Sequence, residues 1–129
     1  MTEESAAVLV VEDDTQLADL YGEFIPDTFS TGIAYSAEEA IDRLEPALDV
    51  LILDRELNNR NASDVLDYAT SNSIDCQVII VSGYDESTTD GIEYNAYLQK
   101  PVSGAELVRT LKVVLDSRRD RAVPVDSSQ

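Results

Sequence analysis

Acidic, hydroxyl and amino side chains stand at or directly after the carboxyl ends of several apolar segments of this sequence. They are Glu12, Asp13, Asp14, Asp54, Ser82 and Lys100. Clustered carboxylates repel one another unless a cation joins them, and an all-oxygen site suits Mg²⁺ or Mn²⁺. A nearby lysine and hydroxyl would donate to phosphoryl oxygens. The set therefore indicates phosphoryl transfer, with Asp54 as the nucleophile at phosphorus.

Each of these residues also has a simpler interpretation when it is taken alone. Asp13 and Asp14 could cap a helix, and we assign Asp14 mainly to that role. Asp54 could be a turn residue at a strand end, and Ser82 could belong to a plain turn with the following glycine. Lys100 could lie in a loop before the last helix. Only their joint occurrence at consecutive strand ends favours a shared site.

Apolar, β-branched segments alternate with amphipathic ones along the chain, which predicts strands alternating with helices. This pattern predicts an α/β fold of three layers, the flavodoxin-like (βα)5 arrangement with a parallel sheet of order 2-1-3-4-5. In that order the carboxyl ends of the first and third strands flank the topological switch point, which is where ligands bind in open α/β sheets. The predicted strands are Ala7–Glu12, Thr31–Tyr35, Asp49–Leu53, Gln77–Val81 and Ala96–Gln99.

Helix signals occupy the intervening segments. Residues with apolar spacing from Leu17 to Ile25 predict a helix that Pro26 limits. Capping boxes of the S-x-x-E type open two others. The remaining predicted helical segments are one that starts after Ser36, with Glu39 as its partner, Ala62–Ser71, and Gly104–Arg121 after Ser103, with Glu106 as its partner.

The length of 129 residues fits one domain. We expect a flexible N-terminus over residues 1–6, the domain over 7–121 and a disordered tail over 122–129.

Without a signal sequence or a membrane-length apolar run, we expect a cytoplasmic protein. The lone Cys76 fits a reducing compartment, as a small buried or half-buried residue, and the lack of histidine excludes tetrahedral zinc chemistry.

The net charge of −17 comes from acidic residues spread along the whole chain. Such a surface repels nucleic-acid phosphates and anionic membranes, so we expect no direct contact with either. It also repels itself unless salt screens it. We therefore infer a salt-in halophile as the source, with an ordinary acidic bacterial protein as the alternative.

The sequence resembles the receiver domains of two-component response regulators, the CheY-like superfamily, over Val8–Leu115. With the charge, this indicates a halophilic archaeon. Four motifs that occur in the same order as in the family carry the resemblance. They are Val8–Asp14, Leu51–Asp54, Ile80–Gly83 and Tyr97–Pro101.

The resemblance implies a role for each matching acidic position. Asp54 would be the phosphoacceptor and a metal ligand. Asp13 would bind Mg²⁺ directly, Glu12 through water, and the backbone carbonyl of Glu56 would be the third protein ligand. A sensor histidine kinase would donate the phosphoryl group, and the domain would catalyse its own Mg²⁺-dependent phosphorylation and dephosphorylation.

The resemblance also implies a conformational switch that signals to an unknown downstream protein. Ser82 would turn toward the phosphoryl group, which Lys100 contacts. Tyr97 would rotate inward with Ser82, although a plain amphipathic strand residue is the alternative for Tyr97. Pro101 would follow a cis peptide bond, as is usual for the family.

The sequence departs from the family pattern in two regions. Asn58 and Ala62 replace a frequent proline and glycine, so we expect a more mobile loop beside Asp54. The segment from Ser82 to Lys100 is shorter than usual by about one helical turn, so the fourth helix should be short or irregular. The face of the fourth helix, fifth strand and fifth helix is the family's usual output surface. The protein is thus expected to be a monomer or a weak dimer through that face.

Two alternatives to a phosphorylated receiver remain. The shortened fourth-helix region favours a receiver-like binding module that signals without phosphorylation. The Asp54-Arg-Glu56 segment faintly resembles the motif of phosphatases with an aspartate nucleophile, although the chain lacks room for a cap domain. The sequence does not identify the kinase, the stimulus or the output target, nor whether the receiver is a stand-alone protein.

We expect the fold to depend on salt, because molar salt shortens the Debye length to about 3 Å and screens the acidic surface. Circular dichroism during a KCl titration should show structure and thermal stability rising from millimolar to molar salt. Full folding with unchanged stability in millimolar salt would remove the halophile interpretation.

Overall fold

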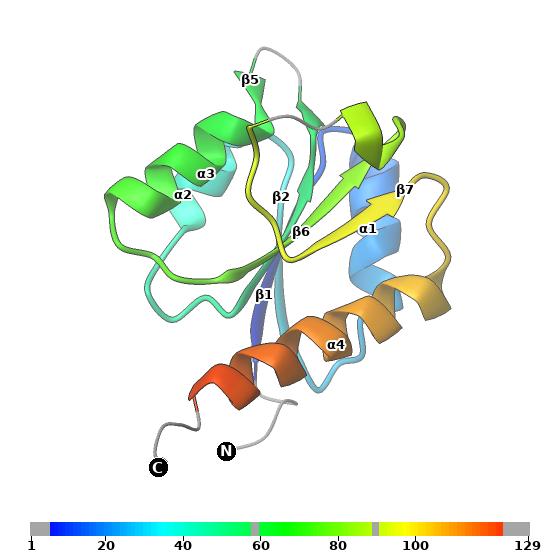
Figure 1. Cartoon of the computed structure of the whole chain (residues 1–129). Coiled ribbons are helices and arrows are strands. Elements are labelled where there is room, and N and C mark those ends of the chain that lie inside the picture. The colour runs from blue at the N-terminus through cyan, green and yellow to red at the C-terminus, as the bar shows by residue number, and fades with distance from the viewer. Residues whose placement is uncertain (1–5, 58–59, 89–90, 123–129) are drawn as a thin grey trace.

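The computed structural model describes residues 6–57, 60–88 and 91–122. Five parallel strands form one sheet in the order β2-β1-β3-β6-β7 (Figure 1). Their bounds are Ala7–Val11 (β1), Ser30–Ala34 (β2), Val50–Asp54 (β3), Gln77–Ser82 (β6) and Ala96–Gln99 (β7). When the strands of a separate hairpin are left out of the numbering, this is the predicted order 2-1-3-4-5. The flavodoxin-like fold class is confirmed.

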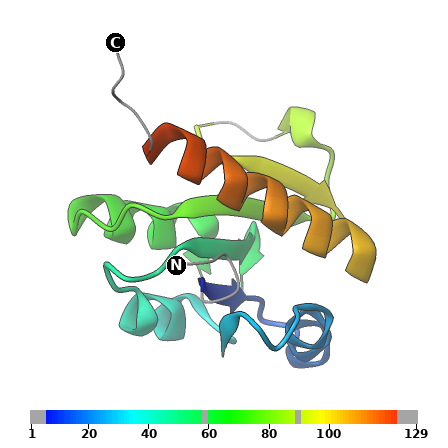
Figure 2. The same cartoon turned by 90° about the horizontal axis from the view of Figure 1, so that it is seen from below.

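Helices cover both faces of the sheet (Figures 1 and 2). Helices α1 (Thr15–Phe24) and α4 (Gly104–Ala122) pack together on one face, whereas α2 (Ala37–Arg43) and α3 (Ala62–Ser71) share the other. These bounds agree closely with the predicted helical segments. Among the described residues, no helix combines the length and the apolar character needed to cross a membrane.

Strand β1 shows why the predicted strands have continuous apolar sequences. Val8 and Val10 belong to the core beneath α1 and α4, whereas Leu9 and Val11 belong to the core beneath α2 and α3. Successive side chains of a strand point to opposite faces, so a strand covered on both sides needs an apolar residue at each position. All four of these side chains are buried.

Side-chain caps fix the starts of three helices at the predicted residues. The carboxylate of Asp14 accepts the backbone N–H three residues ahead at 3.2 Å, so its capping role is confirmed. The Ser36 and Ser103 hydroxyls each accept the N–H of the expected glutamate at 3.1 Å. Such caps satisfy N–H groups that have no partner within the helix. The cap at Asp14 matters most for function, because it starts α1 directly after the two acidic residues that follow β1.

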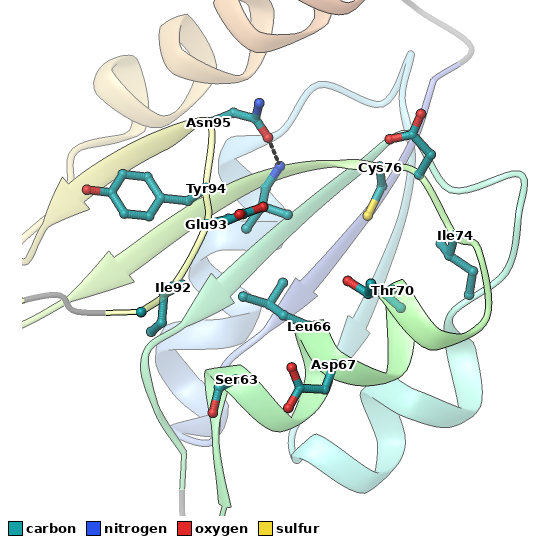
Figure 3. Close-up of a pocket in the computed structure, with 14 residues that line it drawn as sticks. Ser63, Leu66, Asp67, Thr70, Ile74, Cys76, Ile92, Glu93, Tyr94 and Asn95 are labelled. Carbon is teal, nitrogen blue, oxygen red and sulfur yellow. Dashed lines mark hydrogen bonds between the residues drawn. The ribbon is translucent and has the colours of Figure 1, made fainter.

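The connection between β6 and β7 contains one 3-10 turn, Glu86–Thr88, within the part of the chain that the structure describes. The prediction of a short or irregular fourth helix is therefore confirmed. Residues 91–95 run without helix or strand beside α3. Between them lies a groove with a volume of 530 Å³, with Leu66 and Ile92 among its lining residues (Figure 3). Cys76 also lines the groove and is half-buried, as expected.

The segment after Asp54, where a mobile loop was predicted, contains regular structure that the sequence did not indicate. It contains an antiparallel hairpin of β4 (Glu56–Leu57) and β5 (Arg60–Asn61), two residues each. Strands this short cannot show the alternation by which sequence reasoning detects a strand. Asn58, on which the prediction of a mobile loop partly rested, lies outside the described residues, as do most of the predicted terminal segments.

Candidate functional site

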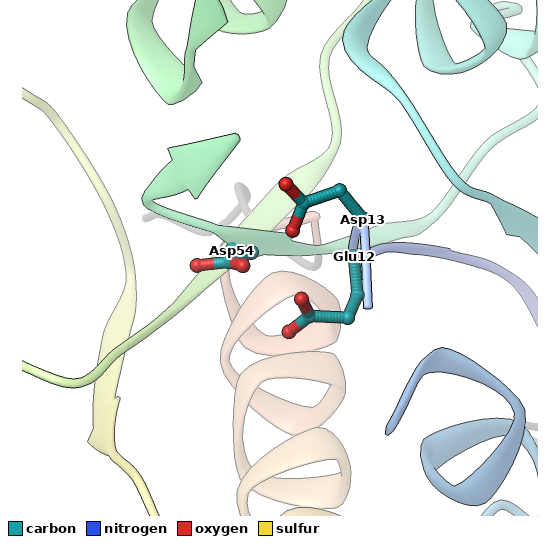
Figure 4. Close-up of side chains that lie close together, drawn as sticks. All are labelled: Glu12, Asp13 and Asp54. Atoms are coloured by element: carbon teal, nitrogen blue, oxygen red, sulfur yellow. The ribbon is translucent and has the colours of Figure 1, made fainter. Parts of the chain in front are cut away.

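The carboxylates of Glu12, Asp13 and Asp54 come together at the carboxyl edge of the sheet (Figure 4). Glu12 and Asp13 directly follow β1, and Asp54 is the last residue of β3. These strands are parallel neighbours, with Val11 beside Leu53, so the residues that come next emerge side by side. One oxygen atom from each carboxylate lies within 4.8 Å of the others.

Lys100 supplies the positive charge of this cluster. Its Nζ lies 3.0 Å from Oε1 of Glu12 and 3.4 Å from Oδ2 of Asp54. The two carboxylate residues are 1% and 3% exposed, whereas Asp13 is half-buried. One ammonium group therefore faces two buried carboxylates with a third beside them. Uncompensated buried charge is costly, so the cluster favours binding a further cation.

The pKa of Asp54 is raised to about 8, mainly by burial and also by the hydrogen bond with the adjacent carboxylate of Glu12 and its charge. The N–H of Glu56, which donates to Asp54 Oδ1 at 3.0 Å, and the charge of Lys100 act in the opposite direction. For Lys100, burial alone would lower the pKa, but the contact with Glu12 and the charge of Asp54 outweigh burial and raise it. Lys100 therefore stays protonated, while the metal-free Asp54 tends to hold a proton.

The residues present fit a divalent cation. Backbone N–H groups fix the carboxylates: Glu12 Oε2 accepts the N–H of Asp14 at 3.1 Å, as Asp54 accepts that of Glu56. The buried hydroxyl of Tyr21 has no hydrogen-bond partner among the described residues and interacts electrostatically with Lys100, Glu12 and Asp54. A hydrated ion offers water molecules to such a hydroxyl. Oxygen ligands of this kind suit a hard cation that keeps part of its water.

A second network lies beside the carboxylates. The Ser82 hydroxyl, at the end of β6 and fully buried, donates to Oε2 of Glu56 at 2.8 Å and accepts the N–H of Tyr84 at 3.0 Å. The Tyr97 hydroxyl donates to the carbonyl of Tyr84 at 2.8 Å. The guanidinium of Arg55 lies 5.7 Å from the centre of the Tyr84 ring, and its Nε lies 3.4 Å from Glu56 Oε2.

The structure therefore brings together the predicted carboxylates and Lys100, and places Ser82 on the next strand. The Lys100–Pro101 peptide bond is cis, as predicted. Sequence reasoning placed Glu56 beside the path of the attacking water and expected its backbone carbonyl to bind the metal, but it missed the contact of the Glu56 side chain with Ser82. It also missed a role for Arg55. Tyr21 was predicted only as part of an amphipathic helix. The signal available in the sequence was the polar hydroxyl that Tyr21 carries on the helix face expected to be buried.

Comparison with known proteins identifies the family. Residues 8–112 match the model of the response regulator receiver domain. The chain belongs to this family. The signal receiver domain of a Vibrio parahaemolyticus protein has the same fold, with a TM-score of 0.81 and 26% identity over 94% of this chain and 99% of that domain. A CheY-like receiver domain from Methanospirillum hungatei, at 24% identity and a TM-score of 0.78, covers 90% of this chain and 98% of its own.

Two relatives show the receiver domain within longer proteins. A Haloferax volcanii protein, named as a candidate transcriptional regulator, is 39% identical over 84% of this chain, which amounts to 19% of that protein. The Escherichia coli transcriptional regulatory protein CpxR is 31% identical over 84% of this chain and 48% of its own length. The chain thus matches half or less of each relative. Because both names refer to transcription, the expectation of no contact with nucleic acid is not confirmed.

The raised pKa of Asp54 predicts how stability depends on pH without metal. The folded protein holds a proton on Asp54 that the unfolded chain has released, so this contribution is complete below pH 3.8 and is lost as the pH rises toward 8. Asp54→Asn should therefore stabilise the protein in EDTA at pH 8, on the order of 2 kcal/mol. The gain should shrink at pH 5.5.

Thermal unfolding in molar KCl measures this difference. Asp42→Asn, which removes an exposed carboxylate from α2, is the control and should show no such pH dependence. Adding Mg²⁺ should stabilise the wild type more than Asp54→Asn. A variant that is less stable than the wild type at pH 8 would contradict the electrostatic account of the cluster.

Proposed function

We propose that this receiver domain accepts a phosphoryl group on Asp54 from the phosphohistidine of a sensor histidine kinase. One observation carries the proposal: Asp54 is buried beside two acidic residues and 3.4 Å from the ammonium group of Lys100. A structural turn residue has no need of such neighbours. Membership of the receiver family supports the same function.

The proposed reaction uses one oxygen of the ionised Asp54 carboxylate as the nucleophile. This oxygen forms a bond to phosphorus while the bond from phosphorus to the imidazole nitrogen breaks, and the nitrogen keeps the electron pair and is protonated. The Lys100 ammonium stabilises the charge on the phosphoryl oxygens. The N–H of Glu56 holds the Asp54 carboxylate in place during the attack. Later attack of water on the phosphorus breaks the bond from phosphorus to the Asp54 oxygen, which releases inorganic phosphate and restores the carboxylate.

A divalent cation, Mg²⁺ or Mn²⁺, is part of the proposal. Asp13 and Asp54 would hold it directly, Glu12 through water, and the backbone carbonyl of Glu56 would complete the protein ligands. Once bound, the ion neutralises the carboxylates, lowers the pKa of Asp54 and balances charge on the phosphoryl oxygens. The residues themselves supply the nucleophile, the ammonium group and the backbone donors.

We further propose that the phosphoryl group draws the Ser82 hydroxyl toward it and that Tyr97 follows. The changed surface would signal to a downstream protein.

The names of the relatives leave transcription open as the eventual output, whereas the charge of −17 argues against direct contact of this domain with DNA. The Haloferax relative supports our proposal of a protein adapted to high salt, and the lone cysteine supports a cytoplasmic location.

A phosphorylation-independent binding module is the second candidate function. In the described part of the β6–β7 connection, helical structure is limited to the 3-10 turn, and this, together with the groove beside α3, favours such a module. The usual output surface of the family includes a fourth helix, so a chain without a full helix there could present a different docking surface. The presence of the carboxylates and of Lys100 at one sheet edge argues for the phosphorylated receiver instead.

Incubation of the folded protein with Mg²⁺ and acetyl phosphate should add one phosphoryl group, because a small acyl phosphate can replace the kinase as donor. Intact-mass spectrometry checks this, and hydroxylamine should remove the added mass. Asp54→Asn should show no gain, whereas the control Asp42→Asn should be labelled as the wild type is. Absence of a mass gain in folded wild-type protein would count against the proposal.

Replacing Tyr84 should shorten the lifetime of the phosphoryl group. Its side chain is 58% exposed and lies next to Arg55, and in the receiver family this position flanks the path of the attacking water. Tyr84→Ala should therefore increase the rate of phosphoryl loss severalfold, as measured by intact mass over time. Tyr68→Ala, which removes another exposed ring from α3, should leave the lifetime unchanged. An unaltered lifetime in Tyr84→Ala would show that the ring does not restrict water.

A further inference from the structure

We propose that the side chain of Glu56 is a positioning residue that holds the Ser82 hydroxyl in the resting arrangement. Glu56 would thereby set the equilibrium between the resting domain and the one in which Ser82 reaches the phosphoryl group. This inference rests on the proposed function, because Ser82 must have a phosphoryl group to turn toward. It assigns to the Glu56 side chain a contact with Ser82 that the sequence did not predict.

The one hydrogen-bond donor of the Ser82 side chain is already used in the structure. A serine hydroxyl has one hydrogen to donate. Here that hydrogen goes to Oε2 of Glu56 at 2.8 Å, while the hydroxyl oxygen accepts the N–H of Tyr84 at 3.0 Å. A carboxylate is a charged acceptor and makes a stronger hydrogen bond than a neutral one. Ser82 cannot donate to a phosphoryl oxygen until it leaves Glu56.

The same contact extends to the second switch residue. The backbone of Tyr84 donates its N–H to Ser82 and accepts the hydroxyl of Tyr97 through its carbonyl. Ser82 and Tyr97 are thus linked through one residue. Removal of the Glu56 acceptor frees the Ser82 hydroxyl, and its reorientation withdraws the acceptor of the Tyr84 N–H. Glu56 therefore acts on both residues of the proposed switch.

Glu56 also contacts the phosphoacceptor itself. Its backbone N–H donates to Asp54 Oδ1 at 3.0 Å while its carboxylate holds Ser82, so one residue joins the two groups that must approach each other. Arg55 Nε lies 3.4 Å from the same Oε2 atom and helps to hold the carboxylate in this position. The negative charge added to Asp54 by a phosphoryl group repels the Glu56 carboxylate, which weakens the contact with Ser82.

The test uses beryllofluoride with Mg²⁺, which occupies the phosphoryl position on an aspartate without a lasting covalent change. Its dissociation constant is measured for the wild type, Glu56→Ala, Glu56→Gln, Ser82→Ala and the double variant Glu56→Ala/Ser82→Ala. We expect Glu56→Ala to bind about tenfold more tightly, since apparent affinity scales with the population of the competent state. Glu56→Gln keeps an acceptor oxygen and should gain much less.

The double variant separates positioning from simple charge repulsion. If Glu56 acts through Ser82, the tenfold gain should disappear in the Ser82→Ala background. An equal gain in that background, or equal gains in Glu56→Gln and Glu56→Ala, would overturn the inference, because loss of a negative charge would then explain the whole effect. Glu45→Ala, which removes an exposed carboxylate after α2, is the control and should change nothing.

A second measurement needs no ligand and therefore distinguishes this inference from the proposed function. In NMR spectra of the resting protein, Glu56→Ala should shift the amide signal of Tyr84 and the ring signals of Tyr97, while Glu45→Ala should not. Unchanged signals in Glu56→Ala would overturn the role of Glu56 even if beryllofluoride binds. Failure of beryllofluoride to bind the wild type would contradict the proposed function, whatever these signals show.

Discussion

The ion pairs of Lys100 with Glu12 and Asp54 are the interactions on which the rest of the site depends. They join the ends of β1, β3 and β7 at one edge of the sheet. Two adjacent buried carboxylates would be costly without them. Because a single ammonium group does not balance the three acidic residues, the cluster keeps a negative charge that a cation can neutralise. Burial, together with the adjacent carboxylate of Glu12, raises the pKa of Asp54 in the metal-free protein.

Much of this arrangement could be predicted from the sequence because it follows from topology. Apolar runs that end in polar residues indicate buried parallel strands, and parallel strands direct their carboxyl ends to the same edge. The positions of Glu12, Asp54 and Lys100 needed no further information. The capping residues Asp14 and Ser36 were likewise recognisable, because a cap depends on residues only three apart.

The side-chain network of Glu56 could not be predicted in the same way. Its partner Ser82 comes from another strand, and the direction of the Glu56 side chain depends on the conformation of a short hairpin that has no detectable periodicity. Arg55 carries no motif at all. The lack of a regular fourth helix could be predicted from the small number of residues between β6 and β7. The groove beside α3 could not, because it depends on the position of residues 91–95.

Because Glu12 and Asp54 are buried, salt affects their interactions differently from those of the exposed charges of this small domain. Mobile ions weaken interactions between exposed charges but reach enclosed ones poorly. The acidic surface should thus respond to the ionic strength of the surroundings. The charge of the buried carboxylates should depend instead on pH and on a bound metal. As long as the domain stays folded, a change in salinity should therefore alter its surface interactions more than the chemistry of the buried carboxylates.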